Sequence, residues 1–159
     1  FQHVKKVIIP GTIEKMGMEA FADCRNMEEV CIRDGVREIG KHAFIDCHSL
    51  TNVTIPGTVK KIEAYTFSDC RGLEKVYLCE GVEEISGAAF FCCKALKEIL
   101  VPNTVWRLEA IEDVQRREVF DFCPNVTVYC PKGSEVEAYC IKTNVRYDNN
   151  LDKFKGKYV

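Results

Sequence analysis

The feature that most constrains the fold of this chain is a period of 23 residues marked by cysteine. Cys24, Cys47, Cys70 and Cys93 follow one another at this interval. A phenylalanine stands three residues before each of them, and a large apolar residue three residues after. Similarity at a fixed period is the signature of a repeat architecture. The chain is therefore expected to stack equivalent units rather than fold around one irregular core.

Each unit contains a strand signal followed by a turn signal. Leu50, Val53 and Ile55 alternate with polar residues, which is typical of a short strand. Pro56-Gly57 ends it, because proline has no N–H to donate to a ladder. In the segment 59–67 the apolar residues have the spacing of one or two helical turns. The pattern predicts an α/β solenoid of the leucine-rich repeat class, with a parallel β-sheet on the concave face and short helical or irregular convex segments.

The repeat phase also predicts how the chain is divided. Cys123 follows Cys93 by 30 residues, so an insertion of seven residues is expected between positions 108 and 119. Its charged segment 109–118 is compatible with a helix and is predicted to lengthen a convex connection. Residues 1–147 are expected to form one solenoid of about six strands, with a closing segment at 126–147 and a tail at 148–159.

The first strand, Val4–Ile9, is predicted to be an unpaired edge, because the chain opens in the middle of a unit. We expect this edge either to continue into earlier repeats of a longer protein or to self-associate with a second copy.

The run 49–62, with the later residues 66–70, resembles the 23-residue leucine-rich repeat of the BspA type. The ending 126–134, followed by Ala138-Tyr139 and the segment 145–147, is similar to the closing segment of that family. Such repeats are typical of surface proteins of anaerobic gut and oral bacteria, the Treponema and Bacteroides-like class, and of some parasitic protists. The resemblance implies a solenoid and a role in adhesion and protein interaction, and it supplies no catalytic residues.

Composition excludes some classes of function. The chain has 22 Lys and Arg against 24 Asp and Glu, a net charge of −2, whereas a nucleic-acid binder needs a basic excess. No apolar run reaches the roughly 18 residues that a membrane span requires. We therefore predict no nucleic-acid partner and no membrane span in this segment.

The ten cysteines have two predicted environments. Those of the repeat column occupy equivalent positions with parallel Cβ vectors, so free thiols packed as small hydrophobes are favoured over a disulfide ladder. The column consists of Cys24, Cys47, Cys70, Cys93 and Cys123. Cys31 and Cys79 are expected to face outward from the sheet. No Cys-x-x-Cys spacing is present, so neither a metal nor another cofactor is predicted.

The sequence offers little for catalysis. Its histidines are His3, His42 and His48, and the last two are expected in exposed turns. No motif for a nucleophile, a phosphate loop or a metalloprotease occurs. We predict that the chain is not an enzyme.

The concave face is the predicted binding surface. Strand residues that alternate with the core positions form two adjacent rows on this face. The candidate residues are Lys6, Ile8, Glu29, Cys31, Asn52, Thr54, Lys75, Tyr77, Glu98 and Leu100. Tyr77 is the best single candidate, because aromatic residues are enriched at the energetic centres of interfaces. An alternative is that these rows reflect only the preference of strands for β-branched and aromatic residues.

The sequence thus predicts a non-enzymatic adhesion or protein-interaction module of a cell-surface or secreted bacterial protein, which binds a protein or a glycan. Two alternatives remain open. The repeats could be a structural spacer in a larger surface protein. The many thiols also leave an intracellular scaffold possible, since an oxidising compartment tends to oxidise them.

Overall fold

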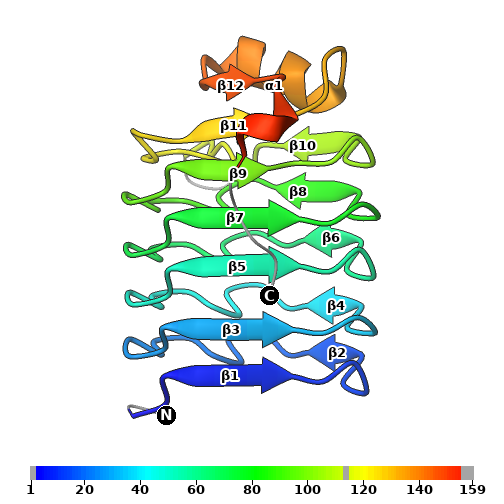
Figure 1. Cartoon of the computed structure of the whole chain (residues 1–159). Helices are drawn as coiled ribbons and strands as arrows, with labels where there is room; N and C mark the ends of the chain where they lie inside the picture. The colour runs from blue at the N-terminus through cyan, green and yellow to red at the C-terminus, as the bar shows by residue number, and fades with distance from the viewer. Residues whose placement is uncertain (1–2, 113–114, 155–159) are drawn as a thin grey trace.

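The chain stacks its repeats into a column of parallel strands (Figure 1). The structure is a computed structural model that describes residues 3–112 and 115–154. Six longer strands follow one another across a parallel sheet in the order of the chain. They are β1 (Lys6–Ile9), β3 (Glu29–Ile32), β5 (Asn52–Ile55), β7 (Lys75–Leu78), β9 (Glu98–Leu100) and β11 (Thr127–Tyr129). This arrangement confirms the predicted leucine-rich repeat solenoid with a parallel sheet.

A second column of shorter strands lies beside the first (Figure 1). It contains β2 (Lys15–Met16), β4 (Glu38–Ile39), β6 (Lys61–Ile62), β8 (Glu84–Ser86) and β10 (Arg107–Glu109). The helical interpretation of 59–67 is wrong, because β6 and turns occupy that segment. Two residues of the same unit, Tyr65 and Asp69, have φ of 59° and 56°. Backbone of this left-handed kind interrupts a right-handed helix, so the irregular form of the convex segment is the one adopted.

The interior is built from the two columns that marked the period. The rings of Phe44 and Phe67 are parallel with centroids 5.2 Å apart, and both side chains are fully buried. The Cys70 thiol donates to the Phe44 carbonyl oxygen of the preceding unit at 3.1 Å, and Cys93 donates to Phe67 at 3.1 Å. The predicted burial of the cysteine column is confirmed. A thiol fits here because it fills a small space and also satisfies a buried carbonyl.

The last unit ends in a helix and a short strand. Helix α1 spans Glu135–Thr143. Its N-cap is Ser134, whose side chain accepts a hydrogen bond from the Glu137 N–H. The hydroxyl of Tyr139 donates to a carboxylate oxygen of Glu118 at 2.9 Å and accepts from the Val119 N–H at 3.0 Å. Strand β12 (Tyr147–Asp148) adds a seventh strand to the sheet beside β11. The 3-10 turn η1 (Leu151–Lys153) follows.

The insertion forms a different structure from the one predicted. Ile111 and Arg117 make an antiparallel bridge, so the described part of 109–118 doubles back as a loop instead of forming a helix. Arg116 pairs with Glu112 at 2.9 Å and with Glu118 at 3.0 Å. Positions 113–114 of the insertion lie outside the described residues.

Candidate interaction surface

The predicted middle row lies on one face of the seven-stranded sheet. Ile8 stands opposite Cys31, Thr54 opposite Tyr77, and Tyr77 opposite Leu100. We call the face that carries this row the sheet face. Register alone brings these side chains together, because equivalent residues of stacked parallel strands point the same way.

The exposure of the row differs along the sheet. Ile8 is 55% exposed, whereas Thr54, Tyr77 and Leu100 are half-buried. Cys31 stands in the sheet-face row opposite Ile8, but only 4% of this residue is exposed. Its short side chain lies beside the larger Ile8 on the neighbouring strand. Cys31 therefore offers little surface to a partner, while Cys79 is half-buried.

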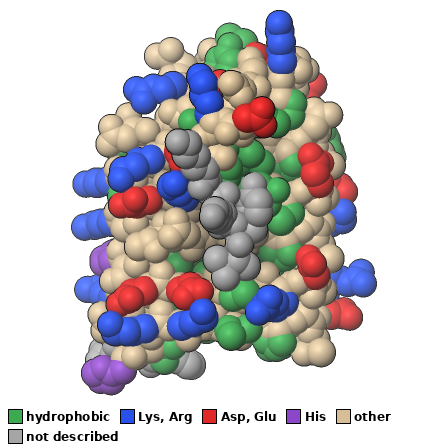
Figure 2. All heavy atoms as spheres, viewed as in Figure 1, with side chains coloured by type: hydrophobic (Ala, Val, Ile, Leu, Met, Phe, Trp, Pro, Cys, Tyr) green, Lys and Arg blue, Asp and Glu red, His purple; other side chains and the backbone are tan. Residues whose placement is uncertain are grey.

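The adjacent charged row is already paired within the sheet. Lys6 bonds Glu29 at 2.8 Å, and the ammonium of Lys75 lies 3.3 Å from a Glu98 carboxylate oxygen. Asn52 stands between these two pairs, opposite Glu29 on one side. Figure 2 shows charged side chains toward both margins of this face, with hydrophobic side chains between them. The rows thus form an apolar strip with a polar edge.

The sheet face contains a residue that the fixed period missed. Counting by period places Cys130 opposite Leu100, but the structure pairs Leu100 with Tyr129. The sixth unit has one residue fewer between its first two core positions, Val126 and Val128, than the fifth has between Leu96 and Ile99. That shortening turns Tyr129 onto the sheet face and Cys130 into the core.

An aromatic ring from outside the sheet packs on Tyr77 and Tyr129. Phe154 follows η1, and its ring centroid lies 6.1 Å from that of Tyr77 and 5.6 Å from that of Tyr129. Only 8% of Phe154 is exposed. The tail was predicted only as a C-terminal extension, because a contact between residues so distant in sequence leaves no periodic signal.

Two of the histidines contact groups other than thiols in the described structure. His42 stacks on Tyr65 with ring centroids 5.1 Å apart, and His48 lies 3.2 Å from an Asp46 carboxylate oxygen. Both are half-buried rather than exposed as predicted. Burial raises the pKa of the Cys70 and Cys93 thiols well above the usual range, which opposes formation of the nucleophilic thiolate.

Across the ranges 3–112 and 115–154, no cluster of three or more His, Cys, Asp or Glu side chains is arranged to hold a metal ion. The helices in the same ranges are too short or too polar to cross a membrane.

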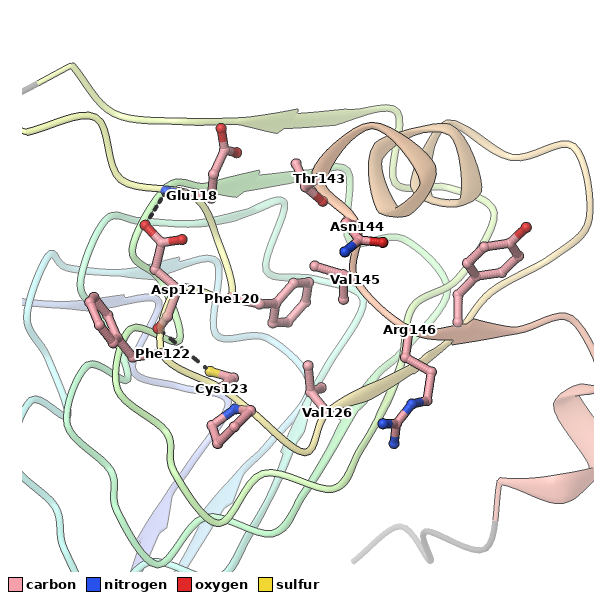
Figure 3. Close-up of a pocket in the computed structure, with 12 residues that line it drawn as sticks. Glu118, Phe120, Asp121, Phe122, Cys123, Val126, Thr143, Asn144, Val145 and Arg146 are labelled. Carbon is pink, nitrogen blue, oxygen red and sulfur yellow. Dashed lines mark hydrogen bonds between the residues drawn. The ribbon is translucent and has the colours of Figure 1, made fainter.

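A hollow of about 600 Å³ lies at the end of the stack. Figure 3 shows Phe120 pointing toward Val145, with Asp121 and Arg146 on different sides of the hollow. Phe120 and Cys123 form the last turn of the phenylalanine and cysteine columns. The closing segment adds a strand and a helix but no further turn of this kind, so one side of the 120–123 turn is left uncovered. The Asp121 carboxylate accepts the Glu118 N–H at 2.9 Å. This hollow is therefore a consequence of how the stack ends.

An aromatic group also lies on the turns that carry the phenylalanine and cysteine columns, which we call the turn edge. Phe91 contacts Tyr65 and Phe122 edge to face, at 6.4 and 5.3 Å between centroids. The Arg117 guanidinium lies 4.8 Å from the centre of the Phe91 ring. Phe122 is 62% exposed. This group leaves no periodic signal in the sequence, because its members occupy different columns of successive units.

The sequence of this chain matches a known repeat family. The sequence profile described as BspA type leucine rich repeat region matches residues 1–131 in six copies. A search of characterised proteins found no match.

Solved structures share the fold. A leucine rich cell surface protein from Faecalibacterium prausnitzii aligns with a TM-score of 0.74 at 23% identity, over 86% of this chain and 34% of that one. A leucine-rich repeat protein of T. pallidum aligns with a TM-score of 0.71 at 23% identity, over 79% of this chain and 58% of that one. The pneumococcal vaccine antigen PcpA aligns with a TM-score of 0.63 at 20% identity, over 81% of this chain and 31% of that one.

This chain thus spans between about a third and three-fifths of the length of these structural relatives. The repeat period, the stacked phenylalanine and cysteine columns and the match over residues 1–131 agree with one another. The chain belongs to the BspA-type leucine-rich repeat family.

Proposed function

We propose that this chain is a non-enzymatic interaction module that binds a protein through its sheet face, as part of a cell-surface or secreted bacterial protein. The observation that carries the proposal is the aromatic and aliphatic strip of half-buried Tyr77 and Leu100 between charged margins, continued by Tyr129, which is 8% exposed beside Phe154. Strips of this kind, apolar at the centre and polar at the rim, are typical of protein interfaces.

The charged row supports a role in contact rather than in chemistry. Its lysines and glutamates neutralise one another across the strands. Exposed ion pairs of this sort contribute little stability, about 0–1 kcal/mol each. They do impose a pattern of charge at the rim of the strip, and such a pattern serves specificity more than affinity.

Relatives support the proposed location. Two of the aligned structures are named as a cell surface protein and as a vaccine antigen. Both contain similar solenoids within longer chains. We infer the same setting for this module.

The experiment is a selection of displayed peptides on the immobilised chain, with a glycan array in parallel. Binders should be lost from Tyr77→Glu and Leu100→Glu, which place charge in the strip. They should be retained by Trp106→Glu, a control at a residue that is 55% exposed and directly precedes β10. Binders that survive both strip variants, or that are lost equally from the control, contradict a site on the sheet face.

A further inference from the structure

Phe154, which follows η1 and belongs to no strand, packs on the sheet face. Its ring contacts Tyr77 on β7 and Tyr129 on β11, which stand on either side of Leu100 on β9. Alternate strands lie about 10 Å apart. A ring within about 6 Å of both tyrosines must therefore lie over the strand between them.

The segment that carries the ring is attached to the sheet by few bonds. In residues 151–154 the backbone donors serve the turn itself, since Lys153 donates to Asn150 and Phe154 donates to Leu151. Leu151 is 37% exposed. Phe154 also lies outside the continuous cluster of buried residues that forms the interior. The contact is thus a ring seated on a finished surface.

A charged contact accompanies the ring. The Lys153 ammonium bonds a carboxylate oxygen of Asp148 at 3.0 Å, and Asp148 belongs to β12 at the edge of the sheet. A hydrogen bond from the Asn150 N–H, together with this contact, holds the pKa of Asp148 below its usual value. The sheet therefore offers an aromatic seat beside a carboxylate, and the tail fills both with consecutive residues.

We propose that the seat between Tyr77 and Tyr129 binds a peptide that presents an aromatic side chain preceded by a basic one, with Lys153-Phe154 as its intramolecular occupant. This inference rests on the proposed function and names the class of partner. A partner has to displace the tail, so the tail lowers affinity for any peptide that uses the same seat. Tethering gives the tail an effective concentration in the millimolar range, which only a comparable or tighter ligand overcomes.

The test uses a fluorescein-labelled peptide with the sequence of residues 148–154, Asp-Asn-Asn-Leu-Asp-Lys-Phe, measured by fluorescence anisotropy. The full chain with Phe154→Ala has an empty seat and is expected to bind the peptide at least about tenfold more tightly than the unaltered chain, because the competing ring is gone. Lys153→Glu is a second variant that loosens the tail while keeping its ring, and it should shift binding in the same direction.

Two controls locate the site. The peptide with its phenylalanine changed to alanine should not bind, and Tyr77→Ala in the Phe154→Ala background should abolish binding. Phe122→Ala, at an exposed ring on the turn edge, should behave as the unaltered chain.

Equal affinity of the unaltered chain and both tail variants overturns the inference, as does binding that is independent of Tyr77. Acidic or sulfated sugars that bind the Phe154→Ala variant in place of the peptide also overturn it. The proposed function fails separately, if selected ligands bind regardless of the strip variants or are lost equally from the Trp106→Glu control.

Discussion

At the scale of the residue, the stacked phenylalanines are the main hydrophobic contribution of each unit. Phe67 is fully buried and lies 5.2 Å from Phe44 and 5.5 Å from Phe90, measured between ring centroids. Phe67 thus has an aromatic neighbour on both sides. Offset aromatic pairs contribute about 0.5–1.5 kcal/mol beyond the area they bury.

Phe67→Ala should therefore destabilise the chain by about 3–5 kcal/mol, the usual cost of removing a large buried ring. Chemical denaturation followed by circular dichroism measures the change. Phe122→Ala is the matched control, because its ring is 62% exposed, and it should change the free energy of unfolding by less than about 0.5 kcal/mol. Similar losses for the two variants would show that the stacked column does not carry the stability.

The buried cysteines of the closing segment predict a dependence on alkaline pH. Burial raises the pKa of Cys130 to about 11 and that of Cys140 to about 12, from 9.0. Between these values and 9.0 the unfolded chain has lost protons that the folded chain still holds, so stability falls as pH rises. The denaturation midpoint should decrease from pH 9 to pH 11. The decrease should be smaller in Cys130→Ala/Cys140→Ala, and an equal decrease would assign the effect to other groups.

At the scale of the element, adjacent turns alternate between two forms, which makes the true period two units. Gly81 has φ of 113°, and its N–H donates to the Thr104 hydroxyl oxygen of the next unit at 3.0 Å. The same hydroxyl donates to the Val82 carbonyl at 2.7 Å. Thr58 makes the equivalent pair of bonds to Gly35 and Val36.

Thr104→Val keeps the shape of the side chain but removes both bonds. It should cost about 1–3 kcal/mol, the usual penalty for leaving buried partners unsatisfied. Thr104→Ser should restore most of the loss in thermal and chemical unfolding. Thr12 holds the same position in the first unit, is exposed, and makes no such bonds among the described residues, so Thr12→Val should have little effect. A comparable loss in Thr12→Val would refute the bridging role.

At the scale of the whole molecule, strand pairing is interrupted between the second and third units of the stack. Strands β3 and β5 share a single registered pair, Glu29 with Asn52, whereas β5 and β7 share four. Strands β4 and β6 are not paired, and a hollow of about 450 Å³ lies beside them. Arg37 and Lys60 occupy equivalent positions of the two units, and like charges at such positions oppose close approach.

The missing strand pairing between β4 and β6 predicts uneven hydrogen exchange. The N–H groups of Glu83 and Glu84 donate to the Lys60 carbonyl at 2.8 and 3.1 Å, whereas Lys60 and Lys61 make no corresponding backbone bond to β4 within the described chain. The amides of Lys60 and Lys61 should therefore exchange at least about tenfold faster than those of Glu83 and Glu84, as resolved by NMR. Equal protection at the four amides would show that the two units are as tightly joined as the others.

Much of this architecture follows from sequence because it is periodic. Phe67 and Cys70 recur with their neighbours in phase, so stacking, the parallel sheet and the buried columns could be predicted. The true form of segment 59–67 and of the insertion could not be predicted, and both were expected to be helical. Short apolar spacings fit a helix and a turn equally well. The two-unit alternation of the turns is present in the sequence as Pro-Gly-Thr or Pro-Asn-Thr against Asp-Gly or Glu-Gly, and only the bonds of Thr58 and Thr104 explain it.

The sequence by itself determined which side chains enter the core and which face each candidate residue occupies, because in a stacked solenoid the local period fixes both. Tertiary structure decided which of those candidates remain accessible. Cys31 is shielded beside Ile8, Tyr129 reaches the strip through a one-residue shortening, and Phe154 covers Tyr77. Such contacts join segments far apart in the chain, and their geometry depends on side-chain size and chain length rather than on any repeated pattern.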